Sequence, residues 1–160
     1  MSRNWGIPTK TDDGAFGQAR RERPVATLGV TTVFGVIGAA VAAISFNDAR
    51  DVIENVFHGW SLVLAVVAAG VGCWTYVWVA RPRFAAHFTG AGDAFSDLLR
   101  FYAKAAFALV GVLGLAKFAH AAVGDQVAVL LLCLAGGAGA AAAFQTVLAF
   151  VPAYRTDEKA

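Results

Sequence analysis

Charged residues are scarce in this sequence. Asp, Glu, Lys and Arg together make up 15% of its 160 residues, whereas an ordinary soluble domain carries about a quarter. The scarcity is concentrated in four long apolar stretches, and the charges gather between them, which is how a bilayer sorts residues. The net charge of +2 is too small to build a nucleic-acid surface, so we expect no nucleic-acid partner.

Cysteine is rare as well. Cys73 and Cys133 are the only two, and each lies inside an apolar run, which argues against a disulfide scaffold and a Cys-rich metal site. The sequence also lacks the motifs of serine hydrolases, zinc proteases, thiol oxidoreductases and P-loop proteins. We therefore predict no catalytic residue, no metal site and no catalytic activity of the chain's own. Nothing in the sequence demands a cofactor.

Apolar residues are abundant, and they form runs long enough to cross a bilayer. Pro24 can open the first run, Gly124 follows the third, and Pro152 ends the fourth. Each run has roughly 20 residues or more, which is the length that a bilayer core requires, and in lipid such segments must be helical. We predict an all-α bundle of four transmembrane helices at 25–46, 56–80, 94–123 and 126–151.

The expected third helix is longer than a bilayer is thick. Asp93 follows a Gly-rich break and can cap a helix that begins at Ala94, and nothing stops this helix before Gly124. A helix over 94–123 is about 45 Å long, so its first turns extend beyond the membrane core on the inner side. The apolar side chains there are expected to lie on the membrane surface or against a partner. They are Phe95, Leu98, Leu99, Phe101 and Tyr102.

The orientation of the chain follows from its Lys and Arg residues. Polar segments 1–24 and 153–160 flank one transmembrane domain, 25–152. Eleven basic residues fall in these segments, in the loop between the second and third helices, and at the inner start of the third helix, where they are Arg100 and Lys104; the loops of the opposite side hold Arg50 alone. The positive-inside rule predicts that both termini lie in the cytoplasm or matrix, at a bacterial plasma membrane or the mitochondrial inner membrane.

Four aromatic residues are predicted as interfacial anchors. Trp60 and Trp78 stand near opposite ends of the second run and are separated by about 27 Å of helix rise, close to the hydrocarbon thickness. Tyr102 and Tyr154 fall at the inner ends of the third and fourth helices. Trp and Tyr side chains are enriched at membrane–water interfaces.

Lys117 is the costliest side chain in the apolar runs. It lies within the third helix, several residues from its outer end. An ionisable group inside a membrane is a functional candidate by default. The alternative is structural, since a Lys side chain can extend to the headgroups or pair with a nearby carboxylate. The candidate carboxylates are those of Asp48, Asp51, Glu54 and Asp125.

Two histidines are candidate cofactor ligands. His120 lies one turn beyond Lys117 on the same helix, and His58 opens the second run at the same boundary. A pair at similar depth could hold haem or contact a quinone head group. The competing interpretation is that both rings are simply hydrated, because no haem-site pattern surrounds them. Lipid is the ligand that the sequence favours.

Small residues at regular spacing predict close helix packing. The first helix offers Gly35, Ala39 and Ala43, and the fourth offers Ala135, Gly139 and Ala143. Small residues four positions apart let two helices approach closely in lipid. Gln145, Thr31 and Thr32 can add hydrogen bonds between helices, although a Thr can also bond its own helix.

These features favour a non-catalytic accessory subunit of a larger membrane protein complex, with other membrane subunits as partners. A respiratory or other energy-transducing complex, engaged in electron transport, is the kind expected for small helical subunits. One alternative is a small oligomeric transporter or channel lined by Lys117 and His120. Another is a haem-binding or quinone-binding membrane subunit that uses His58 and His120.

Overall fold

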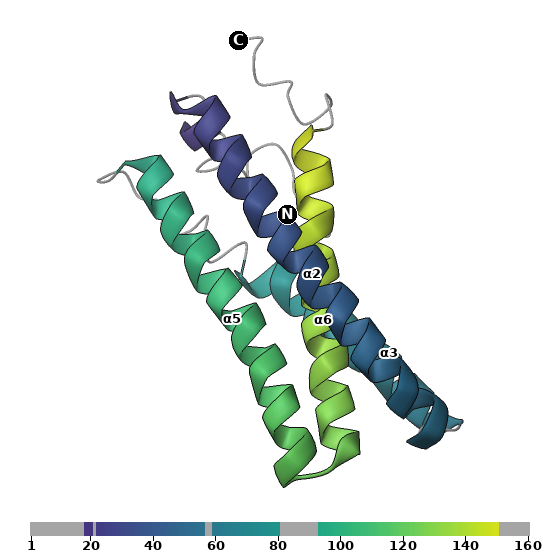
Figure 1. Ribbon diagram of the computed structural model, residues 1–160. Coiled ribbons are helices and arrows are strands. Elements are labelled where there is room, and N and C mark those ends of the chain that lie inside the picture. Colours follow the sequence, from purple (N-terminus) through teal and green to yellow (C-terminus); the bar gives the residue numbers. More distant parts are fainter. Residues whose placement is uncertain (1–17, 21, 57–58, 81–92, 151–160) are drawn as a thin grey trace, which may run out of the picture.

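The fold is a set of long helices that run the length of the molecule (Figure 1). A computed structural model describes residues 18–20, 22–56, 59–80 and 93–150. Within these ranges every regular element is helical. The elements are α2 (Pro24–Val56), α3 (Trp60–Trp74), its π-helical continuation η1 (Thr75–Ala80), α5 (Ala94–Ala122) and α6 (Asp125–Phe150). The all-α class is confirmed.

Helix α2 is longer than the expected 25–46. It has 33 residues, or about 50 Å of rise, and it continues through the charged residues that end the apolar run. Ala49 is buried on this extension, and Ile53 packs beside it. Arg50 and Glu54 pair one turn apart, with 3.1 Å between Nε and Oε1. The extension stays helical because its inward face remains apolar while its outward face is charged.

The second expected helix, 56–80, is divided. Val56 still belongs to α2, residues 57–58 lie outside the described residues, and the regular α-helix begins at Trp60. From Thr75 to Ala80 the backbone is π-helical. π-Helical turns are rare in proteins, and those that occur often lie at functional sites. This one contains Tyr76, which is buried, whereas Trp74 and Trp78 on either side of it are exposed.

Helices α5 and α6 form a hairpin. Asp93 caps α5 by accepting a hydrogen bond from the Phe95 N–H at 3.3 Å, and the helix runs to Ala122, one residue short of the expected end. Gly124 then takes a φ of +115°, a conformation that glycine adopts without strain. Asp125 begins α6, so the chain reverses within two residues.

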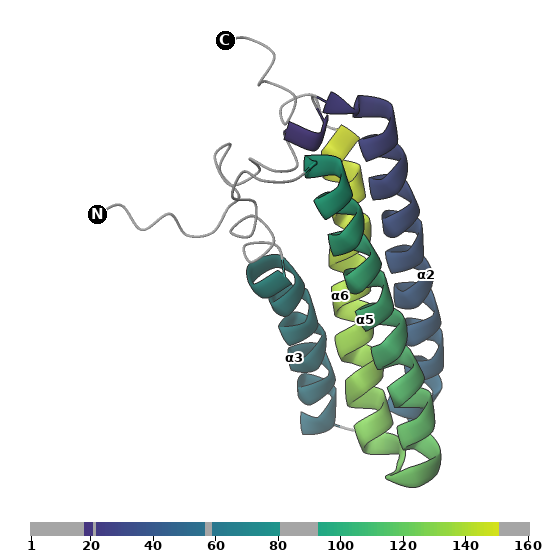
Figure 2. The same cartoon turned by 90° about the vertical axis from the view of Figure 1, so that its left-hand side faces the viewer.

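Helix α6 is the centre of the packing. It contacts α2, α3 and α5, and α2 also packs on α5. Figure 2 shows α2, α5 and α6 close together, with α3 beside α6 at the edge of the group. The close approaches are made at glycine: a Cβ on Gly72 would collide with the backbone of Leu134, and one on Gly137 with the backbone of Ala69. α3 therefore lies against α6 nearly backbone to backbone.

The outward surface is apolar along most of its length. Three helical stretches are long and apolar enough to cross a membrane, namely Pro24–Glu54, Phe95–Ala122 and Asp125–Leu148, and a shorter apolar stretch covers Leu62–Trp78. Large apolar side chains are exposed on every helix, which a soluble monomer rarely tolerates over such an area. The fold fits a multi-pass integral membrane protein in contact with lipid.

Candidate functional site

A polar cluster lies inside the bundle, nearer to the end where α2 and α5 begin. It takes one side chain from each helical segment: Thr31 from α2, Tyr76 from η1, Tyr102 from α5 and Gln145 from α6. The Tyr76 hydroxyl donates a hydrogen bond to the Gln145 side-chain oxygen. The Gln145 amide nitrogen lies 3.5 Å from the Tyr102 hydroxyl, which lies 3.2 Å from the Thr31 hydroxyl. We name these four residues the Tyr–Gln cluster.

Three of the four residues of the cluster are buried, and Gln145 is half-buried. Tyr102 is 3% exposed and Tyr76 is 6% exposed, and Thr31 is fully buried. Phe34 packs between the two tyrosine rings, with its centroid 4.8 Å from that of Tyr102 and 6.1 Å from that of Tyr76. Polar groups in so apolar a setting must bond one another, because each one left unpaired costs roughly 1–3 kcal/mol.

Thr146 adds a second link between α2 and α6. Its hydroxyl donates to the Thr31 carbonyl oxygen at 3.2 Å and also lies 3.5 Å from the Ala142 carbonyl oxygen of its own helix. The same side chain fills the space beside Gly35, where a Cβ would collide with it. Glycine on one helix and a small hydroxyl side chain on the other therefore let α2 and α6 meet closely at the level of the cluster.

The Tyr–Gln cluster was only partly predictable. Thr31 and Gln145 make the hydrogen bonds between helices that the sequence suggests, whereas Thr32 bonds the Leu28 carbonyl of its own helix at 2.8 Å. Tyr102, expected as an anchor at the membrane surface, is instead buried, because it faces α2 and finds a partner in Thr31. Tyr76 lies outside the predicted polar positions, although its spacing from the buried residues Ala65 and Gly72 places all three on one side of the helix.

Lys117 pairs across two helices. Its Nζ lies 3.1 Å from Oδ2 of Asp48, one of the candidate carboxylates, and joins α5 to the extension of α2. The Lys117 side chain is 60% exposed and that of Asp48 35%. The pair lies near one end of the bundle, and the Tyr–Gln cluster lies near the other end. It stands over Ala49 and Ala116, which are buried together just beneath.

His120 is engaged locally. Its Nδ1 lies 2.8 Å from Oδ1 of Asp125, across the turn between α5 and α6. His58, the other proposed ligand, lies outside the described residues. Within the described ranges there is no group of three or more His, Cys, Asp or Glu side chains that could hold a metal ion. The geometry supplies His120 with a carboxylate partner but offers it no second ligand there.

The predicted packing residues and aromatic anchors differ in burial. Gly35, Ala135 and Gly139 are buried between helices, and Ala143 is half-buried. Ala39 and Ala43 lie on the exposed side of α2, so their assignment to the packing face is wrong. A step of four residues turns the helix by 40° too far each time, and the buried positions are instead Gly35, Gly38, Ala42 and Ser45. Trp78 is exposed, while Tyr154 and the Trp60 side chain lie outside what the structure describes.

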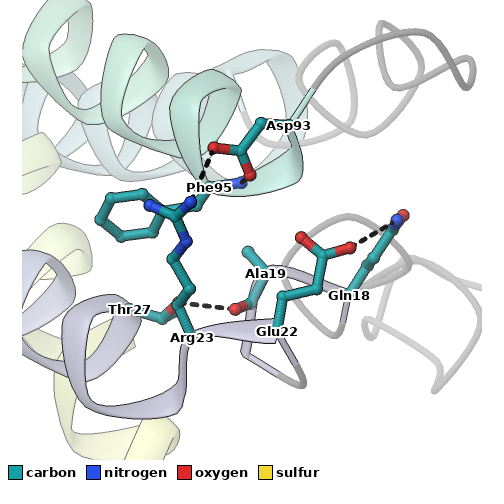
Figure 3. Close-up of polar contacts among 7 residues, drawn as sticks. All are labelled: Gln18, Ala19, Glu22, Arg23, Thr27, Asp93 and Phe95. Atoms are coloured by element: carbon teal, nitrogen blue, oxygen red, sulfur yellow. Dashed lines mark hydrogen bonds and ion pairs between the residues drawn. The ribbon is translucent and has the colours of Figure 1, made fainter.

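A second set of polar contacts fixes the end where α2 and α5 begin (Figure 3). The Arg23 guanidinium lies 3.6 Å from the Asp93 carboxylate and 5.4 Å from the centre of the Phe95 ring. The Thr27 hydroxyl donates to the Ala19 carbonyl oxygen at 3.0 Å. Ala19 itself is fully buried. Residues 18–20 are thus folded back onto the bundle.

The apolar start of α5 packs within the chain itself. Leu98 is 1% exposed and belongs to the same buried group as Ala19, Phe34 and Tyr102. Phe95 and Phe101 are half-buried against that group, and Leu99 is exposed. The expected contact with the membrane surface or a partner is therefore replaced, for most of these side chains, by contact with α2 and the residues before it.

No protein-family model, no curated protein and no solved structure matches this chain. The class that the helices define is that of a multi-pass membrane protein. Its distinguishing internal feature is the largely buried Tyr–Gln cluster, at a level where α2 and α6 pack closely at glycine.

Proposed function

We propose that this chain is a non-catalytic structural subunit of a larger membrane complex. The observation that supports this most is the Tyr–Gln cluster. Its polar groups bond one another, one from each helical segment, so they fasten the helices together. A transport path needs polar groups that face water or a substrate, whereas three of these four are buried in the chain's own core, and the half-buried Gln145 is hydrogen-bonded to Tyr76.

The glycine packing supports the same role. α2 meets α6 at Gly38 and Gly139, and α3 meets α6 at Gly72 and Gly137, in each case with backbone close to backbone. Contacts of this kind leave little space between the helices, and tightly packed interiors resist rearrangement. A rigid insert with an apolar exterior is suited to filling and bracing a larger assembly.

The charged residues that could support transport or cofactor binding are occupied. Lys117 is paired with Asp48, and His120 with Asp125. The first pair joins α5 to α2 and the second joins α5 to α6, and all four side chains are more than one-third exposed. Their arrangement favours a structural role over an ion path or a haem site.

We also propose that Trp60–Ala80 is a fourth span and that both termini lie on the inner side. The stretch Leu62–Trp78 is apolar and lies along α6, with large apolar side chains exposed. α2 begins, α5 begins and α6 ends at one end of the bundle in both views (Figures 1 and 2). Eleven basic residues assigned to that side in the sequence support its placement in the cytoplasm or matrix.

Site-directed cysteine labelling tests this topology. With Cys73 and Cys133 replaced by Ala, single cysteines at Arg100 and at Gln126 report the two ends of the α5–α6 hairpin. A membrane-impermeant maleimide applied to intact cells should label position 126 and leave position 100 unlabelled. Labelling of position 100 alone would reverse the orientation, and equal labelling of both in sealed membranes would contradict a spanning hairpin.

Purification from native membranes tests the subunit role. We expect an energy-transducing complex of the inner or plasma membrane to retain the tagged chain in mild detergent, in fixed ratio to other polypeptides. Recovery of a homo-oligomer that conducts ions in planar bilayers, with conductance lost in Lys117→Ala, would establish the transporter alternative instead. A Soret absorption band in the purified chain would establish haem binding.

A further inference from the structure

One face of α5 combines two cations with an exposed aromatic surface. Arg100, Lys104, Phe107, Gly111 and Phe118 are spaced by four, three, four and seven residues, and at 100° per residue they all fall on one side of the helix. Phe107 is 81% exposed and Phe118 is 71% exposed. α5 is also the least buried of the three long apolar helices. This side of α5, which we call the Phe107 face, is not covered by any of the residues that the structure describes.

The middle of the Phe107 face lacks side chains at two positions. Gly111 and Gly114 lie between the two phenylalanines, and a Cβ added to either glycine would meet nothing within 4 Å. The rings stand about 16 Å apart along the helix axis. Every described glycine at which α6 meets α2 or α3 would, by contrast, place its Cβ within 4 Å of the neighbouring helix. The two glycines therefore leave open space on the outer surface of α5 between Phe107 and Phe118, and we call this space the recess.

The two cations stand at one end of this recess. Arg100 is 74% exposed on its side chain and lies 3.5 Å from Asp97, one turn before it on α5. Lys104 is exposed and makes no ion pair with the described residues. The two residues are about 6 Å apart along the axis. A guanidinium can bond one anion while it keeps other N–H groups for a second, so the pair can bind a phosphate that Asp97 does not neutralise.

We propose that the Phe107 face binds one anionic phospholipid. Its phosphate lies between Arg100 and Lys104, and an acyl chain runs along the helix through the recess at Gly111 and Gly114. Charge complementarity selects this ligand: cations occur only at the end of the face, where a lipid carries its phosphate, and the remainder is apolar, as its chain is. Guanidinium and phosphate match in geometry, and basic residues at this level attract anionic lipid.

This site is independent of the proposed subunit role, since it needs only the bundle and a bilayer. The test uses the full chain in nanodiscs made of phosphatidylglycerol and phosphatidylcholine with identical acyl chains. After transfer to mild detergent, native mass spectrometry counts the lipids that remain bound. We expect one phosphatidylglycerol per chain to be retained in preference to phosphatidylcholine.

Two sets of variants divide the site into its parts. Arg100→Gln with Lys104→Gln should lower the preference for phosphatidylglycerol by roughly thirtyfold, since each basic residue near the surface contributes to anionic-lipid binding. Gly111→Leu with Gly114→Leu fills the recess and should release lipid of both headgroups. Gly29→Leu is the matched control, because Gly29 also has open space around it but lies on α2.

The outcomes separate the proposal from its competitors. Equal retention of the two lipids by the unmodified chain would overturn it, as would equal loss in Gly29→Leu and in the α5 variants. A photo-crosslinker at Leu115 that captures a polypeptide in native membranes, with no lipid retained, would assign the face to a protein partner instead. Unchanged thermal unfolding of each variant shows that lost lipid does not come from a lost fold.

Discussion

Gly38 and Gly139 each fill the space where the other would carry a side chain. A Cβ added to Gly38 would lie 2.7 Å from the Gly139 carbonyl oxygen, and a Cβ added to Gly139 would lie 2.6 Å from the Gly38 carbonyl oxygen. Neither helix can accept even a methyl group there without backbone movement. α2 and α6 are therefore in contact at a point that tolerates glycine alone, and α6 also packs against α3 and α5.

The Gly139→Leu variant should be strongly destabilised. The added side chain meets backbone, which cannot rotate away, so we expect a loss of at least about 1–3 kcal/mol in unfolding free energy. Thermal unfolding in detergent, followed by circular dichroism and size-exclusion chromatography, measures this. Gly29→Leu, where the added Cβ has nothing within 4 Å, should unfold as the unmodified chain does. Equal melting of the two variants would show that the α2–α6 contact is looser than described.

Thr31 and Tyr102 should be energetically coupled. In a double-mutant cycle of Thr31→Val and Tyr102→Phe we expect an interaction energy of about 0.6 kcal/mol, the average for hydrogen bonds between membrane helices. Thr32→Val provides the control, because Thr32 bonds its own helix and should show no coupling to Tyr102. Steric trapping in detergent measures the unfolding free energies. Coupling of Tyr102 to both threonines alike would contradict the specific bond.

Lys117 and Asp48 should act as a pair of modest strength. Because both side chains are partly exposed, Lys117→Gln and Asp48→Asn are expected to couple by less than about 1 kcal/mol. Reversing the pair, with Asp at 117 and Lys at 48, should recover most of the stability lost in Lys117→Asp alone. If the reversed pair melts no higher than that single variant, the two residues do not interact in the membrane.

Arg23 should stabilise the first turns of α5 against local unfolding. Arg23→Gln removes both the ion pair with Asp93 and the stacking over Phe95 (Figure 3), which together are worth about 1 kcal/mol for exposed groups. Hydrogen exchange of the amides after Phe95 should accelerate by about fivefold. Arg20→Gln is the control and should leave those amides unchanged. Acceleration that is confined to α2 would assign Arg23 to its own helix end instead.

Hydropathy predicts the helical class and the approximate length of α5 and α6 well. It predicts the end of α2 poorly, since the apolar run stops at Phe46 while the helix continues to Val56. The charges that end the run lie on the outward side of the extension, and Ala49 and Ile53 keep its inward side apolar. A window average cannot separate the two sides.

The Tyr–Gln cluster shows where sequence patterns lose information. Thr31 and Gln145 are visible as polar residues in apolar helices, so their bonding can be anticipated. Tyr102 resembles an interfacial aromatic by position, and the packing of α5 on α2 turns it inward. Tyr76 shares one side of its helix with the buried residues Ala65 and Gly72, and only the packing of α3 on α6 makes this the inward side.

Membership of a larger membrane complex is the central claim, and blue-native electrophoresis with quantitative mass spectrometry tests it most directly. The unmodified chain and Gly29→Leu, expressed in the native host, should migrate in one large assembly at fixed stoichiometry with other membrane polypeptides. Gly139→Leu should be depleted in that assembly, since its α2–α6 contact is destabilised. If the unmodified chain migrates alone or only with copies of itself, the account is contradicted.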